Sequence, residues 1–321
     1  MTNTVHRPAI LPVQFLRFAA AFAVICAHSL TEMGYHRVGS FGVDIFFVIT
    51  GFVILISTEG ENGGDRFLQR RIARLVPLAW AGLAAYAAVK GFDSWHQLAA
   101  GLLFLTDWHP AGHVFSLYWT LTIEMGFALL FATAMAVSHA RRAELASIGI
   151  IALVLMGANP ILLEFIIGMI AGWLYLRGER IADPWFPALA IGAGMIGLQA
   201  VIDPLMEYRV LWFGLPAGVL ILSIASMCDR PFARLAWLGD ISYSLYVWHL
   251  FVIGAAASLI GHQLPVWAFL ALVTTGSVAV SWVSYRLIEV PARRWISQIR
   301  ILSPQPLARD YRLAMERNEL R

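Results

Sequence analysis

Ten apolar runs recur along the chain, and short polar segments separate them. A helix crosses a bilayer with about 20 mostly apolar residues, and most of the runs come near that length. The pattern therefore predicts an all-α, polytopic transmembrane helical bundle of about ten helices. The runs cover residues 10–31, 41–57, 73–91, 115–138, 145–158, 160–176, 186–203, 209–227, 239–260 and 266–288.

Three segments depart from the simple pattern. Residues 97–106 are apolar but too short to span, which favours an interfacial or re-entrant piece. The runs at 145–158 and 160–176 are also short, and Asn159-Pro160 predicts a turn between them.

The basic residues orient the bundle. If the amino terminus lies in the cytoplasm and the runs alternate, nineteen of the 23 lysines and arginines fall on the cytoplasmic side and three fall outside. Cytoplasmic loops carry such an excess, so both termini are expected in the cytoplasm. We divide the chain into a transmembrane domain at 1–291 and a charged cytoplasmic tail at 292–321, which begins with an amphipathic stretch.

Composition supports the same class. Hydrophobic residues make up 59% of the 321 residues and charged residues 13%, whereas soluble domains are about 45–50% apolar and about 25% charged. The two cysteines, Cys26 and Cys228, fall in or beside apolar runs, and we expect no disulfide. The lipid bilayer is the expected partner, and nucleic acid is not.

Ten apolar residues separate Arg17 from His28 in the first run. At 100° and 1.5 Å per residue, the two side chains share one helix face and lie about 16 Å apart along the axis. Ionisable residues inside a membrane segment are candidates for function. Arg17 also fits the positive end of a signal-peptide-like segment or a residue that snorkels to the interface, and His28 fits an ordinary interfacial position.

Four arginines, the first at Arg66, stand within nine residues around the start of the third run. Arg70, Arg71 and Arg74 follow an i, i+1, i+4 spacing in the stretch FLQRRIARLVP, which we interpret as one arginine-rich helix face. The guanidinium group matches phosphate bidentately, so the stretch predicts a phosphate site. The excess of positive charge in cytoplasmic loops explains the arginines equally well.

Asp44, Glu124 and Glu164 are three of the carboxylates that fall inside apolar runs. Asp44 is expected near the depth of His28, Glu164 at the outer end of its run, and Glu124 about eight residues from the outer face. A buried carboxylate must be paired or protonated, and a carboxylate beside a histidine orients the imidazole. The alternative for Glu124 is a structural ion pair between two helices.

Ser242, Tyr246 and His249 lie at i, i+4 and i+7 in SYSLYVWH, on one helix face. Such a stripe fits substrate contact, and it fits helix–helix association equally. The charges of 285–294 are expected either as a solvated anchor or as part of the inner arginine cluster.

Taken together, these segments resemble the acyltransferase family 3 membrane proteins. The resemblance covers residues 11–294 in the family's order, and the QFLRF and LYWTLTIEM segments are similar to the branch that decorates bacterial exopolysaccharides. It rests on Arg17 and His28 with their ten-residue spacing, GVDIFFVITGF, FLQRRIARLVP, LYWTLTIEM, LLEFIIGM, LGDISYSLYVWH and YRLIEVPARR.

The resemblance implies a function. Members transfer an acyl group, usually acetyl, from cytoplasmic coenzyme A (CoA) to a sugar hydroxyl on an extracytoplasmic or lipid-linked acceptor. Acetyl-CoA is then the donor, and no metal is expected. The protein would lie in the bacterial inner membrane.

The roles of the candidate residues follow from the same resemblance. Arg70, Arg71 and Arg74 would hold the phosphates of CoA, and Arg17 would steady its arm or the thioester oxygen. His28 would act as general base or acyl carrier, and Glu124 would orient it. The substrate-contact candidates are Asp44, Glu164, Tyr246 and His249.

A transporter or flippase is the alternative class. A polar stripe with Arg, His and Glu would also serve a proton-coupled carrier. The arginine-rich stretch before the third run, with the family's motifs around it, favours the acyltransferase.

The topology makes a testable prediction. Reporter fusions in the 177–183 loop are expected to report the cytoplasm, because this loop carries Arg177 and Arg180. A fusion there that is active only outside the cell would contradict the arrangement.

Overall fold

The computed structural model describes residues 10–60, 63–92, 94–105, 117–201, 208–260 and 263–298. This part of the chain forms helices and no β-strand. The helices are α1 (Leu11–Glu32), α2 (Gly42–Ser57), α3 (Gly64–Lys90), α4 (Trp95–Leu102), α5 (Tyr118–Val137), α6 (Arg142–Leu155), η2 (Pro160–Leu162), α7 (Leu163–Leu176), α8 (Trp185–Val201), η4 (Val210–Gly214), α9 (Leu215–Ala225), η5 (Arg230–Phe232), α10 (Ala236–Asp240), α11 (Ser242–Ile260), α12 (Val266–Ser284), η7 (Tyr285–Glu289) and α13 (Val290–Gln298).

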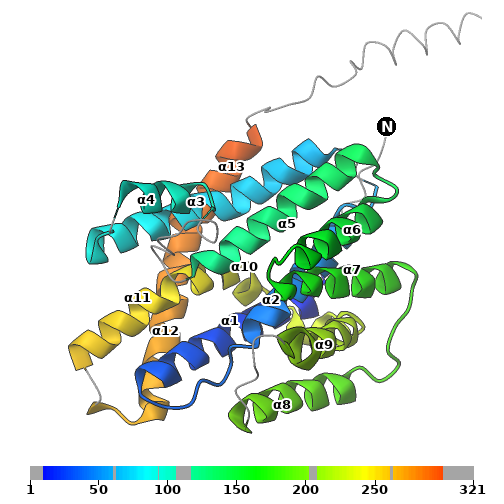
Figure 1. Ribbon diagram of the computed structural model, residues 1–321. Coiled ribbons are helices and arrows are strands. Elements are labelled where there is room, and N and C mark those ends of the chain that lie inside the picture. Colours follow the sequence, from blue (N-terminus) through cyan, green and yellow to red (C-terminus); the bar gives the residue numbers. More distant parts are fainter. Residues whose placement is uncertain are drawn as a thin grey trace, which may run out of the picture.

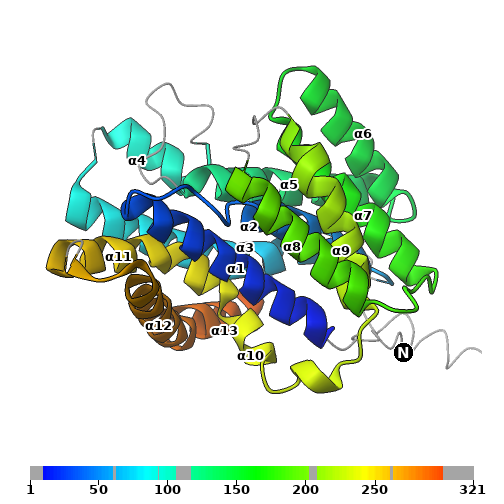
Figure 2. The ribbon, with the colours of Figure 1, turned by 90° about the horizontal axis from the view of Figure 1, so that it is seen from below.

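Helix α1 lies at the centre of the bundle. It packs against α2, α9, α10, α11 and α12. Helices α11 and α12 lie on one side of α1, and α8 and α9 lie on the other, in both views (Figures 1 and 2). Helices α3 and α5 pack together above α2 in Figure 1. The helix that carries Arg17 and His28 is therefore surrounded by protein along much of its length.

The outer surface of the bundle is apolar. Leu155, Val201, Leu259 and Trp267 are each more than 70% exposed. Large exposed apolar surfaces occur on proteins that face lipid. Five helices are long and apolar enough to cross a membrane: Leu11–Glu32, Gly64–Lys90, Tyr118–Val137, Ser242–Ile260 and Val266–Ile296. These features make the chain an integral membrane protein.

Every predicted apolar run contains a helix, and some boundaries differ. Helix α3 begins at Gly64, so the arginine stretch and Pro77 both lie inside one long helix. The short segment near 97–106 forms α4, which ends at Leu102. Residue 106, the start of the fourth run at 115–116 and the tail beyond 298 lie outside the described residues. The run at 266–288 ends in a π-helical turn, η7, that leads directly into α13.

Glycines let α2 and α7 approach closely. A Cβ atom added to Gly168 would overlap the carbonyl oxygen of Val48, and one added to Gly51 would overlap that of Phe165. Small residues are the usual means by which membrane helices bring their backbones together. The contact fixes α2 against α7 and so fixes the orientation of the side chains that α2 presents to α1 and α3.

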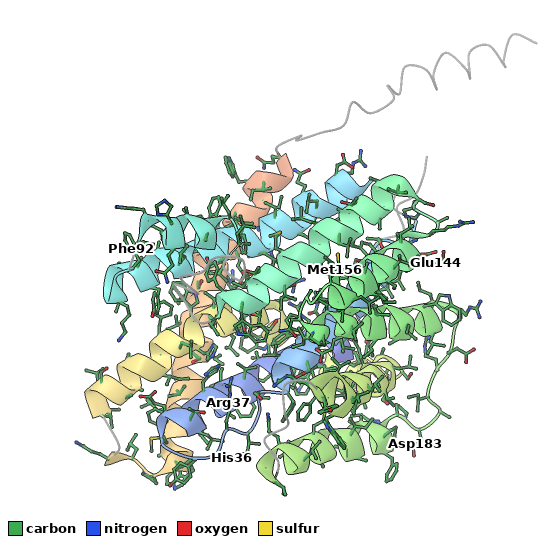
Figure 3. The ribbon with its side chains drawn as sticks, in the orientation of Figure 1. His36, Arg37, Phe92, Glu144, Met156 and Asp183 are labelled. Atoms are coloured by element: carbon green, nitrogen blue, oxygen red, sulfur yellow. The ribbon has the colours of Figure 1, made fainter. Side chains whose placement is uncertain are left out.

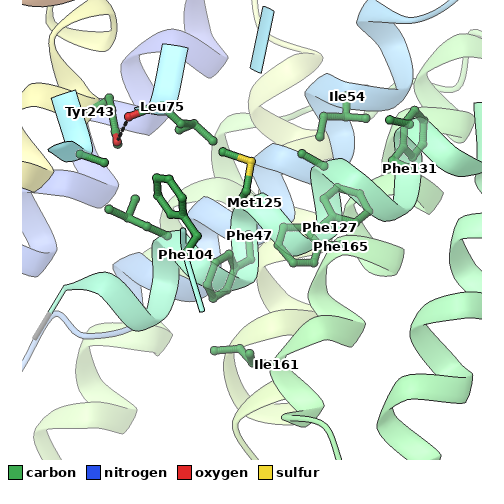
Figure 4. Close-up of a cluster of buried hydrophobic side chains, with 14 of the residues drawn as sticks. Phe47, Ile54, Leu75, Phe104, Met125, Phe127, Phe131, Ile161, Phe165 and Tyr243 are labelled. Atoms are coloured by element: carbon green, nitrogen blue, oxygen red, sulfur yellow. Dashed lines mark hydrogen bonds between the residues drawn. The ribbon is translucent and has the colours of Figure 1, made fainter. Parts of the chain in front are cut away.

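Aromatic side chains fill the space between α2, α5 and α7. The rings of Phe127 and Phe165 stack with centroids 4.0 Å apart and an interplanar angle of 13°. Phe47 packs against Phe165, with ring centroids 5.1 Å apart (Figure 4). Nearby, the Tyr243 hydroxyl donates to the Leu75 carbonyl over 2.7 Å and ties α11 to α3. These contacts hold the helices that line the site described below.

The close approach of α2 and α7 predicts a sensitivity to small substitutions. Gly168→Ala is expected to destabilise the protein by about 1–3 kcal/mol, because the added methyl group must push the two backbones apart. The readout is the thermal unfolding midpoint of the detergent-solubilised protein. Gly197→Ala is the matched control, since nothing lies within 4 Å of the Cβ position at Gly197. Equal midpoints for the two variants would contradict the packing.

Candidate active site

A cavity of about 60 Å³ lies among α1, α2, α3, α5 and α11. It collects charged side chains that are far apart in the sequence. Arg17, Arg71, Arg74, Glu124 and Tyr246, all singled out from the sequence, line it together. The remaining lining residues are Val43, Phe46, Phe47, Ile49, Thr50, Val53, Leu75, Thr120, Leu121 and Tyr243.

The α3 arginines divide between the cavity and the surface. Arg71 and Arg74 lie three residues apart and line the cavity, whereas Arg70 is exposed and is not among the lining residues. Adjacent helical residues point about 100° apart, so Arg70 and Arg71 cannot share a face. The expectation of one face for all three arginines is therefore wrong for Arg70.

Glu124 is the anionic partner of Arg71. A guanidinium nitrogen of Arg71 lies 3.8 Å from Glu124 Oε1, and the two side chains are only 10% and 21% exposed. Arg74 also interacts electrostatically with Glu124. The cavity therefore holds three arginines and one carboxylate, an excess of positive charge that suits an anionic ligand.

Arg17, on α1, lines the same cavity. Its Nη1 donates to Gln14 Oε1 over 3.1 Å, one turn earlier in α1. This bond directs the Arg17 side chain along α1 and keeps its charge within the lining. The structure thus places Arg17 with Arg71 and Arg74 around one cavity.

The ring of His28 lies beside a second histidine. Its centroid is 5.2 Å from that of His249 on α11. The sequence suggested that Glu124 orients His28, but the described ion-pair partner of Glu124 is Arg71. The reason is architectural: α5 packs against α3, whereas α1 packs against α11. The orientation of His28 by Glu124 therefore stays a prediction, and the ring neighbour that the structure gives His28 is His249.

Tyr246 connects this histidine pair to the cavity. Its hydroxyl lies 2.7 Å from Thr120 Oγ1 within the cavity lining. Its backbone carbonyl accepts a hydrogen bond from His249 Nδ1 over 2.7 Å. The ring centroids of Tyr246 and His249 are 5.8 Å apart. Tyr246 thus lies between the cavity and His249, whose ring lies beside His28, and Ser242, Tyr246 and His249 are all buried.

Asp44 and Glu164 form a separate buried group with Arg209. Asp44 accepts from Arg209 Nε over 2.7 Å and from Nη2 over 2.5 Å. Glu164 is fully buried, interacts electrostatically with Asp44 and packs against Gly214. None of these three residues lines the cavity. Arg209 is one of the three basic residues that were assigned to the outer side from the sequence, and its pairing with Asp44 was not predicted there.

The depth expected for Asp44 also differs. The connection from α1 to α2, which carries His36 and Arg37, folds back along α1 (Figure 3). As a result, Gly42 packs against the Ala20 carbonyl in the middle of α1. His28 lies eight residues further on, about 12 Å along the axis. Asp44 is therefore not at the depth of His28.

A further carboxylate, Glu289, lies near the inner arginines. It is 1% exposed, accepts from Arg293 Nη2 over 2.7 Å and accepts from the Ser244 hydroxyl. It interacts electrostatically with Arg74. The expectation of a solvated anchor at 285–294 is thus wrong for Glu289, because the π-helical turn η7 directs this side chain inward. The alternative expectation, that the segment joins the inner arginines, is confirmed for Glu289. Among the described residues, no three His, Cys, Asp or Glu side chains are grouped to hold a metal ion.

The chain is similar to known proteins along most of its length. The chain is 29% identical over 305 residues to the exopolysaccharide production protein ExoZ of Rhizobium meliloti. This match covers 83% of the chain and 94% of the relative. The chain is also 28% identical to a protein of Komagataeibacter xylinus that carries the provisional name membrane-bound transacylase BcsY. This match covers 85% of the chain and 80% of the relative.

A third relative is longer. The chain is 23% identical to the peptidoglycan O-acetyltransferase OatA of Listeria monocytogenes, over 91% of this chain and 57% of the relative. No solved structure matches the chain. A family model described as an acyltransferase domain matches residues 13–286, which include every residue of the cavity. The chain belongs to the acyltransferase family 3 of integral membrane proteins.

Proposed function

We propose that the protein is an O-acyltransferase that transfers an acetyl group from cytoplasmic acetyl-CoA to a sugar hydroxyl. The observation that carries the proposal is the cavity, where Arg17, Arg71 and Arg74 gather inside an apolar bundle. Within the lining, three guanidinium groups face one carboxylate, and an anionic ligand would balance the excess positive charge in a low-dielectric site. The phosphates of CoA would supply that negative charge.

Arg71 and Arg74 are the donor-binding residues of this proposal. Their guanidinium groups donate to phosphate oxygens, and Glu124 holds Arg71 in place through the 3.8 Å pair. Arg17 lies across the cavity and steadies the pantetheine arm or the thioester oxygen. Arg70 is exposed, so we give it no more than a surface contribution to the electrostatic attraction of the donor.

His28 is the base of the proposed reaction. It takes the proton of the acceptor hydroxyl as the oxygen attacks the thioester carbonyl, the C–S bond breaks, and the CoA thiolate leaves and regains a proton. In the covalent variant, His28 first accepts the acetyl group itself and then passes it to the hydroxyl. Arg17 and His28 are about 16 Å apart along α1, so the extended arm of CoA bridges the two ends of the site.

Two relatives support a polysaccharide acceptor. One is named for exopolysaccharide production and another for O-acetylation of peptidoglycan. We propose an exopolysaccharide, or its lipid-linked precursor, as the acceptor. Asp44 and Glu164 lie outside the cavity, so we propose no direct substrate contact for them, and Tyr246 is the proposed contact on α11.

The proposal includes a topology. Ten membrane helices with both termini in the cytoplasm place Arg71 and Arg74 towards the cytoplasm and His28 towards the outer face. The catalytic domain is then 1–291, the tail is 292–321, and the membrane is the bacterial inner membrane. A transporter would use similar buried ionisable groups, and membership of the acyltransferase family favours transfer chemistry.

Loss of the cavity arginines is expected to impair donor use. Arg71→Ala/Arg74→Ala should raise the KM for acetyl-CoA by tenfold or more with a smaller change in kcat, because each charge-assisted contact contributes about 1.5–3 kcal/mol. The measurement uses membrane vesicles, labelled acetyl-CoA and polysaccharide from a strain that lacks acetylation.

Two controls separate phosphate binding from ion pairing. Arg66→Ala removes an exposed arginine from the first turn of α3 and should leave KM unchanged. Arg71→Ala/Glu124→Gln removes the carboxylate that Arg71→Ala leaves unpaired. If this double variant regained the wild-type KM, Arg71 would serve only the ion pair, and its role in donor binding would be wrong.

Replacement of His28 is expected to abolish the chemistry. His28→Gln keeps polarity and much of the volume but cannot act as base, so the transfer rate should fall by about 10²- to 10⁴-fold at equal protein level. Glu124→Gln should be less severe, because Glu124 contacts Arg71 and not the reacting group. A His28→Gln variant within a few-fold of wild type would remove His28 from the mechanism.

A further inference from the structure

His249 holds a fixed tautomer. Its Nδ1 lies 2.7 Å from the carbonyl oxygen of Tyr246. A carbonyl oxygen only accepts, so Nδ1 carries the hydrogen, and in the neutral ring Nε2 presents a lone pair. His249 is fully buried, on the third turn of α11, a helix that packs against α1, α3 and α12.

The lone pair of His249 lacks a partner among the described residues. Nε2 makes no hydrogen bond there, although it is inaccessible to solvent. A buried acceptor without a donor costs free energy, about 1–3 kcal/mol in typical cases. A donor within reach of Nε2 would therefore lower the free energy of the folded protein by forming a hydrogen bond to it.

His28 is the neighbouring donor. Its ring centroid is 5.2 Å from that of His249, and the rings are inclined by 45°. The two histidines come from α1 and α11, which pack through Ala21, Ile25, Leu245 and Ile253. That packing holds the two helices in register and keeps the rings close enough that a His28 nitrogen within hydrogen-bond reach of Nε2 needs no movement of the helices.

We propose that His249 is a positioning residue whose Nε2 accepts the ring N–H of His28 and thereby sets the tautomer of the base. One nitrogen of His28 then carries the hydrogen donated to His249, and the other keeps its lone pair for the acceptor hydroxyl. When His28 takes the hydroxyl proton, both its nitrogens carry hydrogens, and the bond to His249 stabilises the resulting cation. The inference rests on the proposed role of His28 as base.

This arrangement excludes His249 as the base itself. Neither histidine lines the cavity, but His249 is fully buried whereas His28 is partly exposed, so a bulky sugar acceptor can approach His28 and not Nε2 of His249. It assigns to a histidine the role that a carboxylate plays in many acid–base pairs. A neutral partner suits the apolar surroundings of α1 and α11, because it adds no second buried charge.

Amide substitutions at position 249 test the proposal. In His249→Gln the amide oxygen reaches the position of Nε2 and can accept from His28. In His249→Asn the shorter amide reaches only the position of Nδ1 and can donate to Tyr246 but not accept from His28. We expect His249→Asn and His249→Leu to lower kcat by about 10- to 100-fold while the KM for acetyl-CoA stays unchanged, because the base loses its orienting partner. We expect His249→Gln to keep most of the wild-type rate.

The measurement is transfer to polysaccharide in membrane vesicles, normalised to folded protein by fluorescence-detected gel filtration. Equal losses for Gln and Asn, or a wild-type rate for Asn, would overturn the inference. If His249→Leu does not accumulate, the Gln and Asn pair decides the result, since both amides are polar and of similar size.

A double-variant comparison separates this inference from the proposed function. His249→Asn should have no further effect in a His28→Gln background, because the two side chains act as one unit. If His28→Gln retains activity, the base assignment fails. If His28→Gln is inactive but the His249 variants all transfer at the wild-type rate, the base assignment stands and only the proposed pairing of the two histidines fails.

Discussion

Charged side chains inside this bundle must be paired, and that constraint determines much of the structure. Removing a charge from water costs several kcal/mol unless a partner of opposite charge compensates it. Asp44 with Arg209 joins α2 to the turn before α9, and Glu289 with Arg293 joins η7 to α13. Arg71 with Glu124 joins α3 to α5. Each of these pairs ties together elements that line or support the cavity.

The cavity departs from this balance. Arg17 and Arg74 add positive charge beyond what Glu124 compensates within the lining. Glu289 offsets part of this charge from outside the lining. Positive charge in an apolar bundle is costly unless an anion balances it, so an anionic ligand would lower the remaining cost. An acyl donor that carries phosphates would supply that negative charge each time it binds. Stability and donor selection then depend on the same side chains.

The architecture was largely predictable from the sequence because hydrophobicity is a local property. Each of the ten runs contains a helix, and the Arg17–His28 spacing places both on one helix. The pairing of buried charges was less predictable, because Asp44 and Arg209 are 165 residues apart and nothing local links them. The inward turn of Glu289 depends on a π-helical turn that shifts the helix face. Helical geometry alone predicts that the side chains of Arg70 and Arg71 point in different directions, because adjacent residues of a helix are about 100° apart.

The central claim is that an acyl group leaves CoA and becomes an ester on the acceptor. It is tested most directly in vesicles of known orientation with acetyl-CoA labelled by ¹⁴C in the acetyl group and by ³H in the adenine, with acceptor polysaccharide present. The account predicts ¹⁴C in the polysaccharide, released by mild alkali, while ³H stays in the donor compartment. Transfer of both labels across the membrane without ester formation would contradict it.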